Sequence, residues 1–144
     1  QDLPYKIFIN LDFSFREKVL EPQKDIIKVE DYPLLFTNYV VHLSKEEIFA
    51  EKIRAIMTRK KGRDLYDLWY LANLGVSFKE LLVREKLKYY KLENTNISQI
   101  IKRVDSFTEK EFVTDVQPFV PIPEREKLPQ FYAYLKDYLK KYLS

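Results

Sequence analysis

"EEIFAEKIRAIMTRKKGRDLYDLWYLANLG", residues 46–75, contains two helix-forming segments separated by the cationic turn RKKGR. Apolar residues recur every three or four positions on both sides of the turn, which is the spacing of a helix that buries one face. Two consecutive helices joined by a short turn pack against each other in most helical domains. We therefore expect two consecutive helices within a helical domain.

The ends of these two helices are marked by residues with capping chemistry. The SKEE segment predicts a capping box, in which the Ser44 hydroxyl and the Glu47 carboxylate each accept a backbone N–H of the first turn. The first helix should then run over about residues 45–59 and the second over about 63–74. Gly75 follows the second helix as its predicted C′ residue.

Four charged side chains fall at or beside the buried faces of these helices. At about 100° per residue, Lys52 and Arg59 lie within or at the edge of the apolar arc of the first helix, about 10 Å apart along its axis. Asp64 and Asp67 border the buried side of the second helix and are neighbours, being three residues apart. An unpaired buried charge costs several kcal/mol, so each of these groups needs a partner.

Two explanations account for these charges. The first is a structural network in which Lys52 and Arg59 pair with the two aspartates. The second is a polar cleft, where a lysine binds phosphate and a carboxylate handles a metal ion or a proton. Apolar replacements usually stabilise a fold as well as buried ion pairs do, which favours a site. The cations of RKKGR, with Lys52 and Arg54, could add an electropositive rim suited to phosphates.

The flanking sequence changes from strand-like to helical patterns along the chain. Period-two segments predict strands over residues 5–15, 25–30 and 36–43. After the central pair, the predicted elements are a helix opened by a Ser77–Glu80 capping box and ending near Tyr90, a helix within 94–107, an extended proline-rich crossing over 117–129, and a final amphipathic helix over 129–143. Strands followed by helices indicate an α+β fold. We expect a partial sheet in 1–43 and a domain of about five helices in 44–144.

Composition removes several classes of function. The 144 residues contain no cysteine, which excludes disulfides and thiolate metal sites. Their one histidine, His42, leaves little basis for histidine-based metal sites or Ser-His-Asp triads. Two glycines do not suffice for a glycine-rich phosphate loop. No apolar run approaches the roughly 18–20 residues that span a bilayer. The net charge of +3 does not by itself demand a nucleic-acid partner. We expect a cytoplasmic protein without membrane association.

The central segment resembles the AbiEii/AbiGii-type nucleotidyltransferase toxins, a branch of the DNA polymerase β-like nucleotidyltransferase superfamily. The similarity rests on a K-x-x-A lysine (Lys52), an arginine seven residues later (Arg59), and an R-D-x-x-D motif made by Arg63, Asp64 and Asp67. The upstream INLDFSFRE also looks like the family's strand that bears the third metal carboxylate, which would be Asp12.

This resemblance implies nucleotidyl transfer from a nucleoside triphosphate, with Mg²⁺, to an acceptor such as tRNA or a protein, by a toxin paired with a cognate antitoxin in phage defence. Lys52 would contact the triphosphate, and Arg59 and Arg63 would bind phosphate or lock the aspartates. Asp67 or Asp64 would act at the acceptor or orient Lys52. Asp12 would be a metal ligand.

The sequence departs from the family pattern at its start. The family carries a Gly-Gly or Gly-Ser turn and a D-x-D metal pair before the strand of the third carboxylate, and residues 1–11 contain neither. Two-metal transfer needs carboxylates for both ions. We therefore expect this chain to be the C-terminal part of such an enzyme, with weak or absent catalysis on its own. The rival hypothesis is a non-catalytic helical module that contacts an antitoxin or RNA and whose ion pairs are purely structural.

Overall fold

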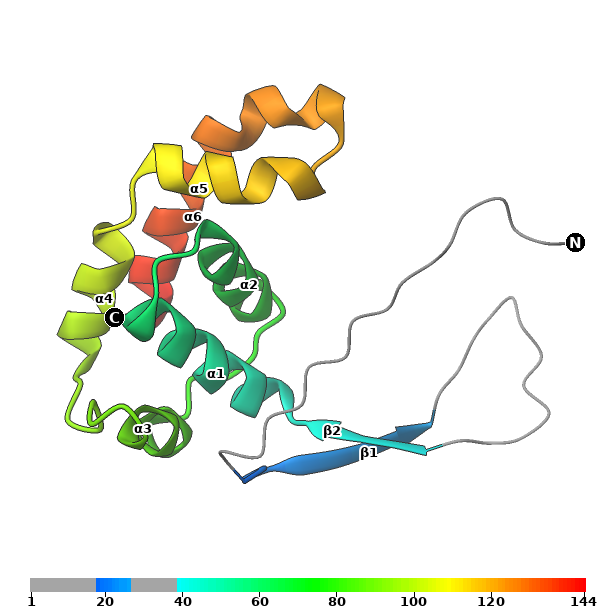
Figure 1. Ribbon diagram of the computed structural model, residues 1–144, viewed down its shortest axis with the longest axis vertical. Helices are drawn as coiled ribbons and strands as arrows, with labels where there is room; N and C mark the ends of the chain where they lie inside the picture. Colours follow the sequence, from blue (N-terminus) through cyan, green and yellow to red (C-terminus); the bar gives the residue numbers. More distant parts are fainter. Residues whose placement is uncertain (1–17, 27–38) are drawn as a thin grey trace, which may run out of the picture.

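The computed structural model describes residues 18–26 and 39–144, which form a two-stranded sheet followed by six α-helices (Figure 1). The strands are β1 (Pro22–Ile26) and β2 (Tyr39–Leu43). The α-helices are α1 (Lys45–Thr58), α2 (Gly62–Asn73), α3 (Glu80–Lys88), α4 (Ile97–Asp105), α5 (Glu109–Val116) and α6 (Leu128–Leu143). Two 3₁₀ helices, η1 (Gln117–Phe119) and η2 (Ile122–Lys127), join α5 to α6. This order confirms the predicted α+β fold class, with one α-helix more than expected.

The two strands form an antiparallel pair that lies outside the helical core. Pro22 faces Leu43 and Ile26 faces Tyr39 across the pair. Every residue of β1 is exposed, and those of β2 are exposed or half-buried. In Figure 1 the pair extends away from the helices at the start of α1. The first predicted strand, with Asp12, lies outside the described residues, as do parts of the other two.

The hydrophobic core lies among the helices and centres on α1. Phe49, Ile53 and Ile56 of α1 are fully buried. α1 packs against α2, α3 and α4, while α6 packs against α2, α4 and α5 and buries Leu135 and Leu139. The two helices predicted in residues 46–75 are therefore confirmed, and α6 closes the bundle on the side of α2 and α4 (Figure 1).

The predicted capping box of α1 is only half formed. The Ser44 hydroxyl accepts the backbone N–H of Glu47 at 3.0 Å, as expected. The Glu47 carboxylate does not return to the Ser44 amide, which instead donates to the carbonyl of Glu21 at 2.9 Å. Glu47 accepts the backbone N–H groups of Leu20 and Glu21 and pairs with Lys86. Leu20 and Glu21, directly before β1, therefore bind both the Ser44 amide and the Glu47 carboxylate in place of the capping box.

The predicted end of α2 is confirmed by its hydrogen bonds. Gly75 has φ +75°, a left-handed conformation that costs other residues about 1–2 kcal/mol. The Gly75 N–H donates to the backbone carbonyl of Ala72 at 2.9 Å, and the Val76 N–H donates to the backbone carbonyl of Leu71 at 3.2 Å. These two bonds make a Schellman motif, which satisfies carbonyls at the end of the helix.

Two predictions for the second half of the chain are wrong. The Ser77–Glu80 capping box does not form: α3 begins at Glu80 after Lys79, whose side chain makes no capping bond. Phe78 packs edge to face on Phe49 with ring centroids 6.4 Å apart. We attribute the start of the helix at Glu80, after Phe78, to this contact with the core. The proline-rich crossing is not extended. It forms η1 and η2, each with proline at one of its first two positions, where no N–H donor is needed.

Helix α5 is absent from the sequence-based expectation, although it carries a capping box. The Thr108 hydroxyl accepts the Glu111 N–H at 3.3 Å, and the Glu111 carboxylate accepts the Thr108 N–H at 2.8 Å. The helix packs directly on the start of α2. The backbone N–H of Gly62 donates to the Asp115 carboxylate at 2.7 Å, and a Cβ on Gly62 would lie 2.6 Å from the Cα of Phe112.

We expect Gly62→Ala to destabilise the protein by about 1–3 kcal/mol, because the added methyl must displace the α5 backbone rather than a flexible side chain. Urea denaturation measures this loss. Asn73→Ala, at an exposed position of the same helix, is the control and should change the free energy of unfolding by less than about 0.5 kcal/mol. A Gly62→Ala protein as stable as the wild type would contradict the close approach of α2 and α5.

Candidate functional site

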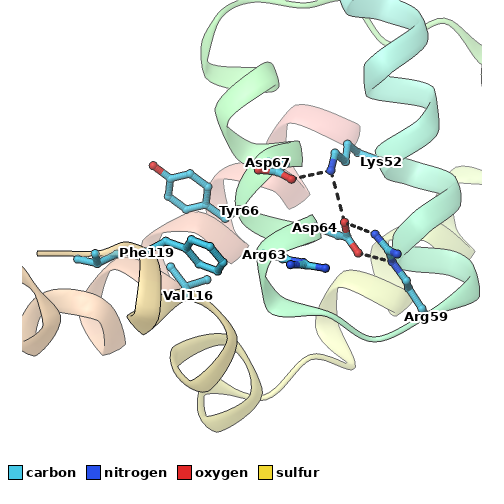
Figure 2. A pocket seen from close by; sticks show the side chains of 9 residues that line it. Lys52, Arg59, Arg63, Asp64, Tyr66, Asp67, Val116 and Phe119 are labelled. Carbon is cyan, nitrogen blue, oxygen red and sulfur yellow. Dashed lines mark hydrogen bonds and ion pairs between the residues drawn. The ribbon is translucent and has the colours of Figure 1, made fainter. Parts of the chain in front are cut away.

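The four charged residues of α1, α2 and the turn between them meet in one cluster (Figure 2). The Lys52 ammonium lies 2.6 Å from an Asp67 carboxylate oxygen and 3.5 Å from one of Asp64. The Arg59 guanidinium donates to both oxygens of Asp64, at 2.7 and 2.8 Å. Lys52 of α1 and Arg59 of the following turn therefore pair with the aspartates of α2.

The two aspartates differ in their surroundings. Only 1% of the Asp64 side chain is exposed, whereas 42% of the Asp67 side chain is exposed. Burial by itself would raise the Asp64 pKa, but the hydrogen bonds and charge of Arg59, with the charge of Lys52, outweigh it and hold that pKa below its ordinary value. Asp64 is thus a buried anion that fixes two cations, and Asp67 presents its carboxylate toward solvent.

A pocket of about 510 Å³ opens beside this cluster. Its lining combines the charged groups with apolar and aromatic ones: Lys52, Arg59, Arg63, Asp64, Tyr66, Asp67, Val116, Phe119 and Val120. Both the volume and the mixture of apolar walls with few polar groups are typical of small-molecule sites. The ion pairs are therefore neither dispersed in bulk solvent nor sealed away from it.

The turn that carries the cations is held by α5. Helix α1 ends at Thr58, and Arg59 has an extended backbone (φ −143°, ψ 164°). Lys60 pairs with Glu111 at 2.9 Å, a contact that is the main cause lowering the Glu111 pKa to about 2. With the bond from Gly62 to Asp115, this pairing fixes the turn at two points. The backbone that carries Arg59 and Arg63 is consequently held in a defined position.

The structure brings together most residues that the sequence singled out. Arg63 lines the pocket, is exposed, and makes no ion pair with a carboxylate of residues 18–26 or 39–144. Arg54 does not line the pocket, contrary to the predicted rim, and pairs with Glu51. Asp12, the predicted metal ligand, lies outside the described residues.

Sequence reasoning missed the apolar wall of the pocket. Helical phase places Tyr66 on the solvent side of its helix, whereas its ring in fact packs on Trp69 and Phe131 at 5.6 and 5.9 Å. Val116 ends the unpredicted helix α5, and Phe119 lies on η1, in the segment expected to be extended. The residue spacing of the sequence carries no signal for this wall.

The described part of the chain does not by itself provide a metal centre. It contains no group of three or more Asp, Glu or His side chains arranged to hold an ion. Both oxygens of Asp64 already accept hydrogen bonds from cations, which leaves Asp67 as the pocket's available carboxylate. One carboxylate does not meet the oxygen-ligand requirement of Mg²⁺ without further groups.

A family model described as "Nucleotidyl transferase AbiEii toxin, Type IV TA system" matches residues 2–142. This chain belongs to the AbiEii toxin family. The family resemblance drawn from the central motif is confirmed, and membership makes the chain a nucleotidyltransferase-type toxin of a type IV toxin–antitoxin system, which implies an antitoxin partner. No curated protein and no solved structure matches the chain. Among the described residues, no helix has the length and apolar character needed to cross a bilayer.

Proposed function

We propose that this AbiEii-family pocket binds the triphosphate of a nucleoside triphosphate, and that the toxin transfers the nucleotide to tRNA or a protein. The observation that carries the proposal is the position of Lys52. Its ammonium is held on a rigid helix by Asp67 and Asp64, and it lines a ligand-sized pocket with Arg59 and Arg63. Preorganised cations of this kind stabilise charge that develops on a leaving group, here pyrophosphate.

The two arginines play different parts in this proposal. Arg59 donates two hydrogen bonds to Asp64, so it mainly fixes that carboxylate and adds positive charge at the pocket wall. Arg63 carries no ion pair to a described carboxylate, and its guanidinium is free to bind phosphate oxygens in pairs. Lys52 and Arg63 are therefore the proposed phosphate contacts.

The two aspartates also have different roles in this proposal. Asp64 is buried and holds Arg59 and Lys52, so it acts as a positioning residue. Asp67 accepts the Lys52 ammonium with one oxygen, while its other oxygen has no hydrogen-bond partner among residues 18–26 and 39–144. We assign that oxygen to the acceptor, where it takes the proton of the attacking hydroxyl as a general base.

Nucleotidyltransferases of this kind generally use a divalent metal as well as the triphosphate. A bound Mg²⁺ neutralises phosphate charge and orients the reacting oxygens. We propose Asp12 as one ligand, within a partial sheet formed by residues 1–43, beside a helical domain formed by residues 44–144. The contribution proposed for the described residues is phosphate binding by Lys52 and Arg63 and proton transfer by Asp67.

The rival function is a non-catalytic module that contacts an antitoxin or RNA. The mutual pairing of all four charges favours it, because Lys52, Arg59, Asp64 and Asp67 already satisfy one another without a ligand. In that case the pocket would be incidental, and the cluster would serve stability alone.

Lys52→Ala separates the two functions. If Lys52 binds phosphate, removing its charge-assisted hydrogen bonds should weaken nucleoside triphosphate binding by about 10- to 100-fold. The free energy of unfolding should change by less than about 1 kcal/mol, since Asp64 keeps Arg59 and the half-exposed Asp67 becomes hydrated. Isothermal titration calorimetry measures the first quantity and urea denaturation the second.

Lys45→Ala is the matched control, because Lys45 is an exposed lysine of the same helix outside the pocket lining. It should leave affinity unchanged. A Lys52→Ala protein that loses several kcal/mol of stability while its affinity for nucleotides stays at the wild-type level would support the structural module and overturn the proposed function.

A further inference from the structure

The pocket has a second wall whose chemistry differs from that of the charged cluster. In the view of Figure 2, Lys52, Arg59, Asp64 and Asp67 gather on one side, and Tyr66, Val116 and Phe119 lie on the other. A triphosphate alone uses only the charged side. The apolar side therefore indicates a ligand with a flat, apolar part joined to its phosphates.

Phe119 is the residue of this wall most available to a ligand. It is 71% exposed although it lines the pocket, and no ring of the described residues stacks on it. Its backbone is nevertheless fixed. The Val120 N–H donates to the Gln117 carbonyl at 3.2 Å, and the Arg125 guanidinium donates to the Val120 carbonyl at 2.9 Å. An aromatic face on a fixed turn is a suitable platform for a planar ring.

Tyr66 is the second aromatic residue in the pocket lining. Its ring packs on Trp69 and Phe131, and Phe131 and Trp69 contact each other edge to face with centroids 4.8 Å apart. These contacts restrict Tyr66, so the wall does not need to be ordered by the ligand. Preorganised aromatic groups lose little conformational entropy on binding.

We propose that this wall, centred on Phe119, holds the nucleobase of the nucleoside triphosphate by stacking. The inference rests on the proposed function, since it takes the phosphates to lie against Lys52 and Arg63. Charge complementarity sets the orientation: the tetra-anionic end faces the cations of α1 and α2, and the neutral ring faces η1. Stacking is tolerant of base identity, so each of the four common bases should bind.

The test compares Phe119→Ala with the wild type for two kinds of ligand, the four nucleoside triphosphates and inorganic tripolyphosphate, at equal Mg²⁺. We expect the substitution to weaken nucleoside triphosphate binding by about 5- to 100-fold, the usual effect of removing a stacking side chain. Tripolyphosphate has no base, so its affinity should stay within about 2-fold of the wild type. Phe119→Trp, which restores a stacking face, should recover nucleotide affinity.

Ile122→Ala is the matched control, because Ile122 is 74% exposed on η2 and does not line the pocket. It should alter neither affinity. Equal affinity of wild type and Phe119→Ala for nucleotides, or equal weakening for both kinds of ligand, overturns the base platform while the phosphate site stands. A wild-type protein that binds neither kind of ligand overturns the proposed function together with this inference.

Discussion

Replacing Lys86 by methionine is expected to destabilise the protein by about 3–5 kcal/mol. Lys86 is buried, and its ammonium lies 2.6 Å from a carboxylate oxygen of buried Glu47 and 2.9 Å from one of Glu51. Methionine fills a similar volume without a charge, so Glu47 remains ionised inside the protein with only the N–H groups of Leu20 and Glu21 described at its oxygens. A loss of that size is a large fraction of the roughly 5–15 kcal/mol that stabilises a domain.

The pKa shifts of Glu47 and Lys86 determine how the stabilisation from their ion pair depends on pH. Burial would raise the Glu47 pKa, but the hydrogen bond to Lys86 and those from Glu21 and Leu20 lower it below its ordinary 4.5. Burial would lower the Lys86 pKa, but Glu47 and Glu51 raise it above 10.5. The stabilisation from the pair is therefore fully present between pH 4.5 and 10.5. It is lost as pH falls below that window or rises above it.

In Lys86→Met the burial of Glu47 is no longer opposed by an ammonium, so the Glu47 pKa should rise. The deficit against the wild type should be greatest near neutral pH and shrink as pH falls and Glu47 becomes protonated. Urea denaturation at neutral and acidic pH measures this change. Lys88→Met, at an exposed position of the same helix, is the control and should stay within about 0.5 kcal/mol of the wild type.

Adding Glu47→Gln to Lys86→Met should restore part of the lost stability, because a neutral amide can still accept the Leu20 N–H. Equal losses for the single and double variants would show that the charge of Glu47 is not the cause. A Lys86→Met protein as stable as the wild type would contradict the buried ion pair between Lys86 and Glu47.

Periodicity and caps predicted the helices that bury one regular face. Ser44, Gly75 and the apolar spacing of α1, α2 and α6 acted locally, and the structure keeps the corresponding boundaries to within two residues. Helix α5 was missed although Thr108 and Glu111 form a capping box, because the helix is short and its packing against Gly62 is not visible in the local sequence. Glu47 was misassigned because a contact from 26 residues upstream replaced its local bond.

The charged half of the site was predictable, and the apolar half was not. Helical phase alone brought Lys52, Arg59, Asp64 and Asp67 to one interface, where opposite charges had to pair. The apolar wall depends on how α5 and η1 pack against the helices that precede them. The residue spacing that predicts α1 and α2 therefore does not indicate that Val116 and Phe119 line the same pocket. The same limit hid the role of Lys86, whose partners lie on another helix.

In the intact toxin, Asp67→Asn is expected to lower the rate of nucleotidyl transfer by about 10²- to 10⁴-fold at saturating nucleoside triphosphate, the usual effect of losing a general base. The amide keeps the shape of the carboxylate and can still accept the Lys52 ammonium, so the position of Lys52 should persist. Incorporation of label from α-phosphate-labelled nucleoside triphosphates into total bacterial tRNA, or into bacterial protein, measures the rate.

Nucleotide binding should respond in the opposite direction. The Asp67→Asn substitution removes a negative charge from beside the phosphate contacts, so affinity for the triphosphate should be unchanged or a few-fold tighter. This split between rate and affinity separates a base from a structural ion pair, whose loss would disturb Lys52 and weaken both. Asp105→Asn is the matched control, because Asp105 is 45% exposed and pairs with Lys140 at 3.2 Å outside the pocket. If Asp67→Asn retains the wild-type rate, the proton goes elsewhere, and Asp67 serves only to hold Lys52 in place.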